Sequence, residues 1–397
     1  MNNRRRFLAS LVVGALTTVS LAACSSSQPA AEEGSNTPSA DTGAQELVIT
    51  DIEGREVKLP KQPERIVLGE GRGLFVTSLL DKENPLDKVV AMGSDLKSNV
   101  PDFYSRLEEK VPAVKDVQDI GSIKKGDVLA ETITSLNPDV LIMSLDQYKA
   151  AEASGMLQQL DGANIPYLVT DFRVKPLENT TKSVELYGKV FGKEDQAKAF
   201  NETWQTTVDR VKATTEKVSE RPTVLVWRAA GLLDCCATWN DANISELVNF
   251  AGGKNIGDDV IEGEAGDLTA EKVIEVDPQV IIATGGDWST KKTKAGDPAQ
   301  FAAAGYGIDE ATAKDTLNKL VENQAGFDLL QAPKNGDLHN IWHQFYNSPL
   351  NYVALAQIAK WIHPDQYEDV DIDQMWKEAH DKFMPISSDG IFFVTNK

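Results

Sequence analysis

Short runs of branched apolar residues recur along the chain, and each run is bounded by glycine, proline or charged residues. A pair of shorter strands around a polar glycine turn is expected at 47–51 and 54–57. Continuous apolar runs are typical of strands buried on both faces of a parallel sheet, so the pattern predicts an α/β fold. The clearest runs occupy residues 66–68, 89–92, 140–142, 167–169, 223–227 and 280–282.

Two of these runs, 140–142 and 280–282, belong to an internal repeat. Residues 131–142 (ETITSLNPDVLI) return as residues 271–282 (EKVIEVDPQVII). Each copy has a helix end, a turn marked by Pro138 or Pro278, and a buried strand, which is the pattern of an αβ unit in a parallel sheet. The repeat indicates two lobes built on one plan. The alternative is a chance recurrence, because such junctions are common in α/β proteins.

Between the two copies, apolar residues follow a helical spacing from about 179 to 218. Gly188 and Gly192 are the glycines within this stretch, and no proline interrupts it, so long helices are predicted. The expected organisation is an N-terminal α/β lobe at 47–178, a helical connector at 179–220 and a C-terminal α/β lobe at 221–397.

The N-terminus has the pattern of an export signal. Residues 1–23 begin with three arginines, continue through an apolar stretch and end on a small pair, the order of a secretory signal peptide. The string LAAC, which ends at Cys24, is similar to a bacterial lipobox, in which the cysteine is acylated. Residues 24–46 are expected to be a lipid-anchored flexible tether. The alternatives are a plain signal peptide or a membrane helix, although the apolar part is shorter than the ~20 residues that a spanning helix needs.

Composition narrows the function classes. The 397 residues are long enough for two domains, and their formal net charge is −20. Such an excess of acid repels phosphate backbones, so nucleic-acid binding is excluded as a main function. Three cysteines are too few and too clustered for a disulfide framework or a four-ligand zinc site. A vicinal disulfide is the preferred interpretation of the adjacent Cys235 and Cys236, since redox catalysis lacks a CxxC motif.

Candidate ligand-binding residues follow the predicted strands, because ligands of open α/β sheets bind beyond the carboxyl ends of the strands. Three arginines in this set would suit an anionic ligand on an otherwise acidic protein, and the alternative is that each merely pairs with surface carboxylates. The aromatic side chains would form flat apolar walls for a large chelate. The candidates in these positions are Arg72, Tyr148, Phe172, Arg173, Trp227, Arg228, Trp239 and Trp288.

Four histidines lie near the C-terminus, and two of them, His339 and His343, are four residues apart. On a helix this spacing would place both imidazoles on one face, but the other ligands of a metal site are missing, so none is predicted. The segment around His343 and Tyr346 is rich in aromatic and polar groups. Both residues are therefore added to the cleft candidates, with haem iron as a conceivable target of His343.

Several segments together resemble the class III substrate-binding proteins of ABC importers, the lipoproteins for ferric siderophores, haem and cobalamin. The resemblance implies two Rossmann-like lobes with mostly parallel sheets, joined by a long connecting helix, with the ligand in the cleft and little hinge motion. A stretch at 287–325 has no place in this pattern. The resemblance is carried by ITDIEGREV (49–57), PERIV (63–67), ISELVNFAGGKN (244–255) and ALAQIAKWIHP (354–364), together with the lipobox.

This resemblance implies a monomeric extracytoplasmic receptor, anchored to the outer face of the plasma membrane at the cell surface or in the periplasm. It would deliver a ferric siderophore to a permease and ATPase complex, with haem, cobalamin or an oxyanion as alternative ligands and with no intrinsic cofactor. Glu246 and, less directly, Glu70 are the docking candidates. An extracytoplasmic enzyme is the alternative class, but the sequence has no GxSxG, HExxH or P-loop motif. A structural surface lipoprotein is a third class.

Overall fold

The computed structural model describes residues 46–397 except 234, 293–295 and 297. The predicted signal peptide, Cys24 and nearly all of the tether lie outside the described residues. Within the described part of the chain, no helix is long and apolar enough to cross a membrane.

The first lobe contains a sheet of five parallel strands in the order β5-β4-β3-β6-β7. All three residues of β3 are buried, as the continuous apolar run predicts. The expected hairpin at the start forms as β1 (Leu47–Thr50) and β2 (Glu56–Leu59), with Gly54 at a positive φ of 75° in the turn. The sheet strands are β3 (Ile66–Leu68), β4 (Val89–Met92), β5 (Gln118–Asp119), β6 (Val140–Ser144) and β7 (Tyr167–Thr170). The helices are α1 (Leu74–Leu80), α2 (Asp95–Asn99), α3 (Pro101–Lys110), α4 (Ala130–Ser135), α5 (Leu145–Ser154) and α6 (Met156–Gly162).

The second lobe contains the sheet β10-β8-β12-β14-β16, in which the last strand is antiparallel and the others are parallel. Its strands are β8 (Thr223–Trp227), β10 (Lys254–Asn255), β12 (Val280–Gly285), β14 (Leu338–Trp342) and β16 (Phe393–Thr395). Two small antiparallel pairs accompany it, β9 (Ala237–Trp239) with β11 (Ala265–Asp267) and β13 (Gly305–Tyr306) with β15 (Gly390–Ile391). Its helices are α9 (Asn243–Phe250), α10 (Ala270–Val276), α11 (Glu310–Asn323), α12 (Gln331–Asn335), α13 (Asn351–Ile362) and α14 (Ile372–Phe383).

The internal repeat is structural. In each lobe a short helix, α4 or α10, leads into a strand, β6 or β12, that lies between two parallel partners. The residues directly before the two prolines, Asn137 and Asp277, have positive φ angles of 47° and 44°. Because a proline disfavours helical backbone in the residue before it, both helices end at the same point of the repeat.

The connector is a pair of helices, α7 (Pro176–Phe191) and α8 (Glu194–Thr215), that pack against each other. The expected connector at 179–220 thus begins three residues earlier, at a proline suited to the first turn of a helix. Gly192, with a positive φ of 67°, ends α7, so the long helix of the resemblance corresponds to the 22-residue α8.

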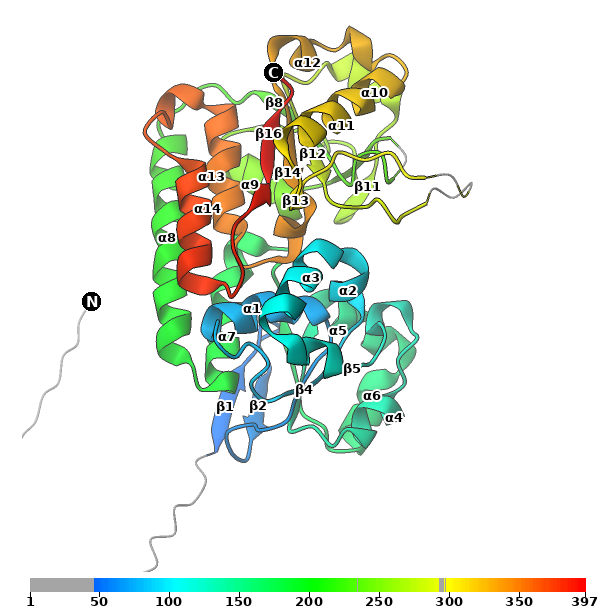
Figure 1. Cartoon of the computed structure of the whole chain (residues 1–397), viewed down its shortest axis with the longest axis vertical. Helices are drawn as coiled ribbons and strands as arrows, with labels where there is room; N and C mark the ends of the chain where they lie inside the picture. The colour runs from blue at the N-terminus through cyan, green and yellow to red at the C-terminus, as the bar shows by residue number, and fades with distance from the viewer. Residues whose placement is uncertain (1–45, 234, 293–295, 297) are drawn as a thin grey trace, which may run out of the picture. The chain divides into compact units, whose positions relative to one another are not determined.

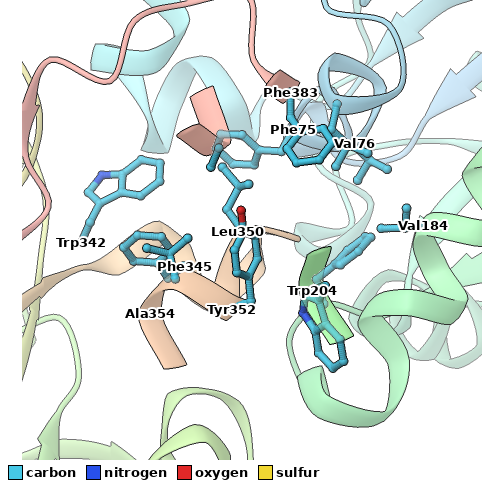
Figure 2. Close-up of a cluster of buried hydrophobic side chains, with 14 of the residues drawn as sticks. Phe75, Val76, Val184, Trp204, Trp342, Phe345, Leu350, Tyr352, Ala354 and Phe383 are labelled. Carbon is cyan, nitrogen blue, oxygen red and sulfur yellow. The ribbon is translucent and has the colours of Figure 1, made fainter. Parts of the chain in front are cut away.

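One apolar core extends through both lobes on the side of the connector. Figure 2 shows Phe75 of α1 and Trp204 of α8 gathered with Leu350 and Tyr352. Trp204 also donates a hydrogen bond from Nε1 to Asn351 Oδ1 at 2.8 Å. Figure 1 shows α8, α13 and α14 side by side, and these helices carry much of this core. Because the core belongs to both lobes, their separation would expose apolar surface.

The unassigned stretch at 287–325 forms β13 and α11, and part of it contacts the first lobe. Lys291 Nζ donates to the carbonyl of Ser98 at 2.8 Å, and the Tyr306 N–H donates to Asp102 Oδ2 at 3.0 Å. The described part of this stretch therefore links the second lobe to α2 and α3.

Candidate functional site

A polar cavity of about 240 Å³ lies between the two lobes. The first lobe contributes side chains that follow β5, β6 and β7. The second lobe contributes side chains that follow β8 and β14, together with residues of the β9–β11 pair and its neighbouring segments. This is the edge at which the carboxyl ends of parallel strands meet. The cavity is lined by Lys124, Asp146, Arg173, Val174, Arg228, Trp239, Ala242, Asn243, Glu264, Ala265, His343 and Tyr346.

Glu70 is the centre of an ion network in the wall formed by the first lobe. Its carboxylate lies 3.1 Å from Arg173 Nη2 and 3.9 Å from Arg72 Nη2. It also accepts hydrogen bonds from Asn347 at 2.7 Å and from Ser144 at 3.1 Å. Burial alone would raise the pKa of Glu70, but the charges of Arg173 and Arg72 outweigh it and lower this pKa to about 2. Glu70 is therefore a buried anion that holds two arginines.

Arg72 has a second acidic partner, since its Nε lies 2.7 Å from Asp95 Oδ2. It also donates to the hydroxyl of Tyr346 in the second lobe. Asp95 is placed for this contact at the start of α2, where it also accepts from the Gly71 N–H at 2.6 Å. Arg72 is consequently buried behind the Tyr346 ring and does not line the cavity.

Arg173 lines the cavity, but its charge is compensated on two sides. Besides Glu70, it forms an ion pair with Asp146, and Asp146 pairs in turn with Lys124. Burial would raise the pKa of Asp146, yet Arg173 and Lys124 together lower it to about 2. The wall from the first lobe therefore carries strong charges that neutralise one another.

Arg228, on the wall from the second lobe, has a different setting. Its guanidinium lies over the indole of Trp239, 5.5 Å from the ring centroid. Within the described part of the chain, no carboxylate lies within ion-pair distance of this guanidinium. Its backbone N–H donates to the carbonyl of Ala237 at 2.8 Å, which ties the end of β8 to β9. Arg228 thus presents an uncompensated positive charge to the cavity.

His343 stands beside this arginine, in the turn after β14. Its Nδ1 lies 2.8 Å from Thr284 Oγ1, and its ring stacks on Trp239 with centroids 6.2 Å apart. Tyr346 packs against the same ring at 4.5 Å. Burial, and then the charges of Arg228, Arg72 and Arg173, lower the pKa of His343 to about 3, so the imidazole is neutral.

Four of the aromatic candidates do not line the cavity. Phe172 is buried in the apolar core that extends through both lobes. Trp227 alternates with Val226 along β8 and points with Leu225 into another apolar cluster, where it packs on Phe327 at 5.2 Å. Trp288 is buried edge-on against His343 at 5.4 Å, so it supports the site without facing the ligand space.

Tyr148 also lies elsewhere, against Arg55 and Tyr167. Asp146 and Tyr148 are two positions apart in α5, which places them about 200° apart around the helix axis. Tyr148 therefore faces away from the cavity that Asp146 lines. The sequence-based placement of Tyr148 and Trp227 in the cleft was wrong.

The two docking candidates are both engaged inside the molecule. Glu70 is 12% exposed and belongs to the ion network, so the sequence-based docking role for it was wrong. Glu246 is 14% exposed and accepts from the Leu177 N–H at 3.2 Å, in the first turn of α7. Burial raises the pKa of Glu246 to about 7 despite Lys175 nearby. Docking through Glu246 stays a prediction.

His339 and His343 do not form a pair, because residues 338–342 are a strand and not a helix. His339 is buried, stacks on Trp361 at 4.4 Å and shares a hydrogen bond with Thr395. Among the described residues, no group of three or more His, Cys, Asp or Glu side chains could hold a metal ion.

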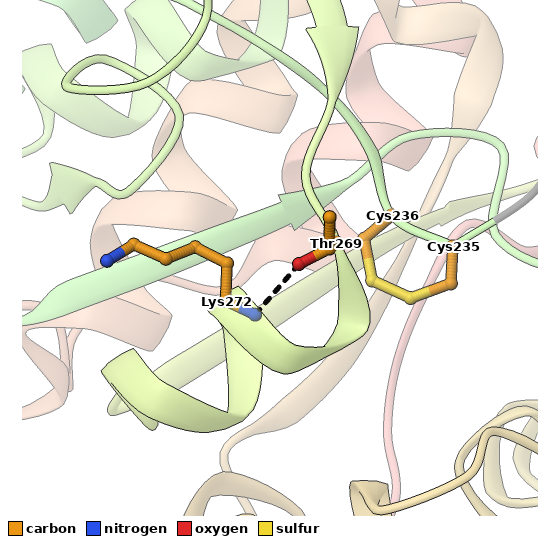
Figure 3. Close-up of a disulfide and its surroundings, with 4 residues drawn as sticks. All are labelled: Cys235, Cys236, Thr269 and Lys272. Carbon is orange, nitrogen blue, oxygen red and sulfur yellow. Dashed lines mark hydrogen bonds between the residues drawn. A yellow bond between two sulfur atoms is a disulfide. The ribbon is translucent and has the colours of Figure 1, made fainter.

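Cys235 and Cys236 are bonded to each other in the structure. Figure 3 shows the pair beside the start of α10, where Thr269 Oγ1 accepts from the Lys272 N–H at 3.1 Å. Cys236 exchanges two backbone hydrogen bonds with Leu268 directly before β9, the strand that carries Trp239.

Several site residues escaped the sequence analysis. Asp95 follows β4 after two residues, so the search for side chains after strands could have found it. Asn243 gave no signal, although its Nδ2 donates to the Arg173 carbonyl at 2.9 Å. Asn347, which contacts Glu70, lies in the segment around His343 and Tyr346 but was not chosen as a candidate. Glu264 at the cavity pairs with Lys149 of α5 at 2.9 Å, an exposed link between the lobes.

Comparisons with known proteins agree with this architecture. A family model described as "Periplasmic binding protein" matches residues 83–303, more than half of the chain. The crystal structure of a TroA-like periplasmic binding protein, FepB from Veillonella parvula, superposes with a TM-score of 0.80 at 26% identity. That match covers 88% of this chain and 100% of the solved one.

Two curated relatives also match this chain. The petrobactin-binding protein YclQ of Bacillus subtilis is 28% identical over 217 residues, which are 54% of this chain and 61% of that protein, so the match spans less than two thirds of its length. The molybdate-binding protein MolA of Haemophilus influenzae is 22% identical over 364 residues, 85% of this chain and 90% of that protein. The family model matches most of the first lobe and most of the sheet of the second lobe. The chain therefore belongs to the periplasmic binding protein family.

Proposed function

We propose that this protein is an extracytoplasmic solute receptor that binds an anionic iron chelate, a ferric siderophore, in the cleft between its lobes and delivers it to an ABC permease. The family to which it belongs consists of solute-binding proteins and not enzymes, and it implies an extracytoplasmic location. The chelate is a transported substrate in this proposal, and no intrinsic cofactor is assigned.

The observation that carries the proposal is the uncompensated guanidinium of Arg228 at the cavity of a chain with net charge −20. Partial burial of a cation without a carboxylate partner costs desolvation free energy, and a bound anion would offset this cost. A guanidinium is also a planar fork of donors that matches carboxylate or catecholate oxygens. Trp239 and Tyr346 add flat surfaces beside it, which suits a ligand with aromatic or conjugated parts.

The size of the cavity limits what it encloses. About 240 Å³ is below the 300–1,000 Å³ that is ordinary for drug-sized ligands, so the cavity would hold the acidic part of a chelate while the rest extends to the mouth. The relative whose name states petrobactin binding supports a siderophore as the ligand.

A tetrahedral oxyanion is the second candidate, and the same small volume favours it. Arg228 and Lys124 are cationic hydrogen-bond donors at the cavity, and the relative named as molybdate-binding matches most of this chain. An oxyanion would be enclosed completely, whereas a chelate would not.

A titration with a ligand panel tests the proposal. Thermal shift and quenching of tryptophan fluorescence, to which Trp239 at the cavity contributes, would be measured with ferric siderophores, their metal-free forms, haem, cobalamin and molybdate. A receptor for ferric siderophores should show a melting temperature that rises with the concentration of the ferric form. A response to molybdate alone would select the oxyanion, and no response to any member would refute both ligand classes.

Membrane attachment is a separate part of the proposal and rests on the lipobox-like string ending at Cys24. The variant Cys24→Ala, expressed in a bacterial host, should move from the membrane fraction to the soluble extracytoplasmic fraction and should lose incorporation of labelled palmitate. An unchanged membrane fraction would indicate a different anchor. Delivery to a permease predicts co-purification of the loaded receptor with its cognate importer.

A further inference from the structure

We propose that His343 presents a protonated Nε2 to the cavity and donates a hydrogen bond to an oxygen of the bound anion. The site would then recognise its ligand through ligand oxygens, without coordination of the chelated metal by an imidazole. This inference deepens the proposed function and rests on the cleft as the ligand site. It differs from the haem-ligand role that the sequence alone allowed.

The hydrogen bonds of Thr284 assign the tautomer. Its hydroxyl has one proton to donate and two lone pairs. Thr284 Oγ1 accepts from the Ala229 N–H at 2.8 Å and lies 2.8 Å from His343 Nδ1. Thr284 is fully buried, and the described residues offer its hydroxyl proton no other acceptor. The hydroxyl therefore donates to Nδ1, and the single proton of the imidazole is on Nε2.

The imidazole is neutral, which is required for this assignment. Desolvation and three nearby arginines, Arg228 foremost, oppose a second proton on the ring. A neutral ring with Nδ1 as acceptor has Nε2–H as its remaining polar group. Within the described residues this Nε2 has no hydrogen-bond partner, and His343 is one of the residues that line the cavity.

Packing fixes the direction of this donor. The His343 ring stacks on Trp239, meets Tyr346 at 4.5 Å and Trp288 edge-on at 5.4 Å, so three aromatic rings restrict its rotation. Arg228 lies over the same Trp239 ring. Arg228, a charged donor, and His343, a neutral donor, thus lie against the same indole and both line the cavity. The oxygens of one ligand can therefore accept from both side chains.

Three variants at position 343 test the role of the donor. Gln places an N–H near the position of imidazole Nε2, Asn places one near Nδ1, and Ala has none. A hydrogen bond to a charged group contributes about 1.5–3 kcal/mol, so His343→Ala should weaken the binding of the ligand found in the panel by about 10- to 100-fold. His343→Gln should recover most of that loss, and His343→Asn should not.

The alternative, coordination of iron by His343, predicts different results. The visible charge-transfer band of a ferric siderophore would then change on binding to the wild type and not on binding to His343→Gln, and Gln would be as weak as Ala. That pattern would overturn the inference. Under our proposal the band is the same in both proteins, and the gallium(III) complex binds as tightly as the ferric one.

A measurement without ligand separates this inference from the proposed function. Long-range ¹⁵N–¹H NMR of the histidine-labelled, ligand-free protein reports which ring nitrogen carries the proton. We expect His343 to show Nε2–H at neutral pH, and Thr284→Val to abolish the clear preference. An Nδ1–H signal for His343 in the wild type would refute the inference even if a siderophore binds, whereas failure of the whole ligand panel would refute the proposed function alone.

Discussion

The two walls of the cleft use arginine in opposite ways. In the wall from the first lobe, Arg72 and Arg173 form ion pairs with Glu70, Asp95 and Asp146, so their charges are neutralised within the protein. In the wall from the second lobe, Arg228 has an aromatic neighbour and, among the described residues, no acidic one. Residue type and position after a strand are the same in the three cases, and the partners differ.

The difference indicates a division of labour. Buried ion pairs stabilise little in net terms, but removing one partner is costly because the other charge is left uncompensated. We therefore expect variants in the first wall to lose stability and variants in the second wall to lose affinity.

The variant Glu70→Gln should be the most destabilising. It retains the shape of the side chain but leaves Arg72 and Arg173 without their shared anion, and the expected loss is about 3–5 kcal/mol in the free energy of unfolding. Chemical denaturation measures it. Glu64→Gln, at an exposed position, is the matched control and should be neutral. A loss below ~1 kcal/mol in Glu70→Gln would contradict the role of the network as a scaffold.

The variant Arg228→Ala should weaken ligand binding by about 10- to 100-fold, because a hydrogen bond to a charged group contributes about 1.5–3 kcal/mol. Its unfolding midpoint should equal that of the wild type, since no ion pair is broken. Arg173→Ala should lower both affinity and stability. The control is Arg210→Ala, which removes an exposed arginine paired with Asp369 and should leave affinity unchanged. Equal stability losses in Arg173→Ala and Arg228→Ala would abolish the contrast.

Low pH should destabilise the protein through Asp146 in the wall from the first lobe. The pKa of Asp146 in the folded protein is about 2, below its usual 3.8, so its stabilisation is present above about pH 4 and is lost as the pH falls towards 2. Denaturation of the wild type between pH 6 and pH 2 should show this loss. Asp146→Asn should lack this contribution, with a difference between the two profiles of up to about 2 kcal/mol. Parallel profiles would mean that the ion pair with Arg173 does not persist in solution.

Reduction of the Cys235–Cys236 disulfide should have the smallest effect. The bond joins neighbours in the chain, so it restricts the unfolded chain little, and we expect a change below ~1 kcal/mol. The hydrogen bonds of Cys236 with Leu268 should keep β9, and with it Trp239, in place. Melting temperature and ligand affinity with and without reductant measure this, with Cys235→Ala/Cys236→Ala as a reductant-independent check. A large loss of affinity on reduction would make the disulfide part of the second wall.

The sequence predicted the framework of this protein better than its cleft. The apolar runs and the repeat around Pro138 and Pro278 depend on local pattern, and both appear in the structure as β6 and β12 with their preceding helices. The expectation that ligand-binding residues directly follow strands identified Arg173 and Arg228 correctly as cavity residues, because the carboxyl ends of parallel strands meet at one edge of a sheet.

The same expectation was wrong where the direction of the side chain decides whether a residue faces the cavity. Trp227 and Arg228 are adjacent in the sequence, yet the alternation of β8 sends one into an apolar cluster and the other to the cavity. Contacts between residues that are far apart in the sequence could not be predicted either. Nothing near Glu70 in the sequence indicates that Asn347, from the other lobe, donates to its carboxylate. The compensation of charge that separates the two walls is therefore visible only in three dimensions.

The apolar core shared by α1, α8, α13 and α14 has a consequence for how such a receptor can diversify. Because the two lobes share one packed core to which Arg228 and His343 do not belong, substitutions at these two residues need not be matched by compensating changes in a hinge. A new ligand specificity can then arise one wall residue at a time, on a frame that stays constant.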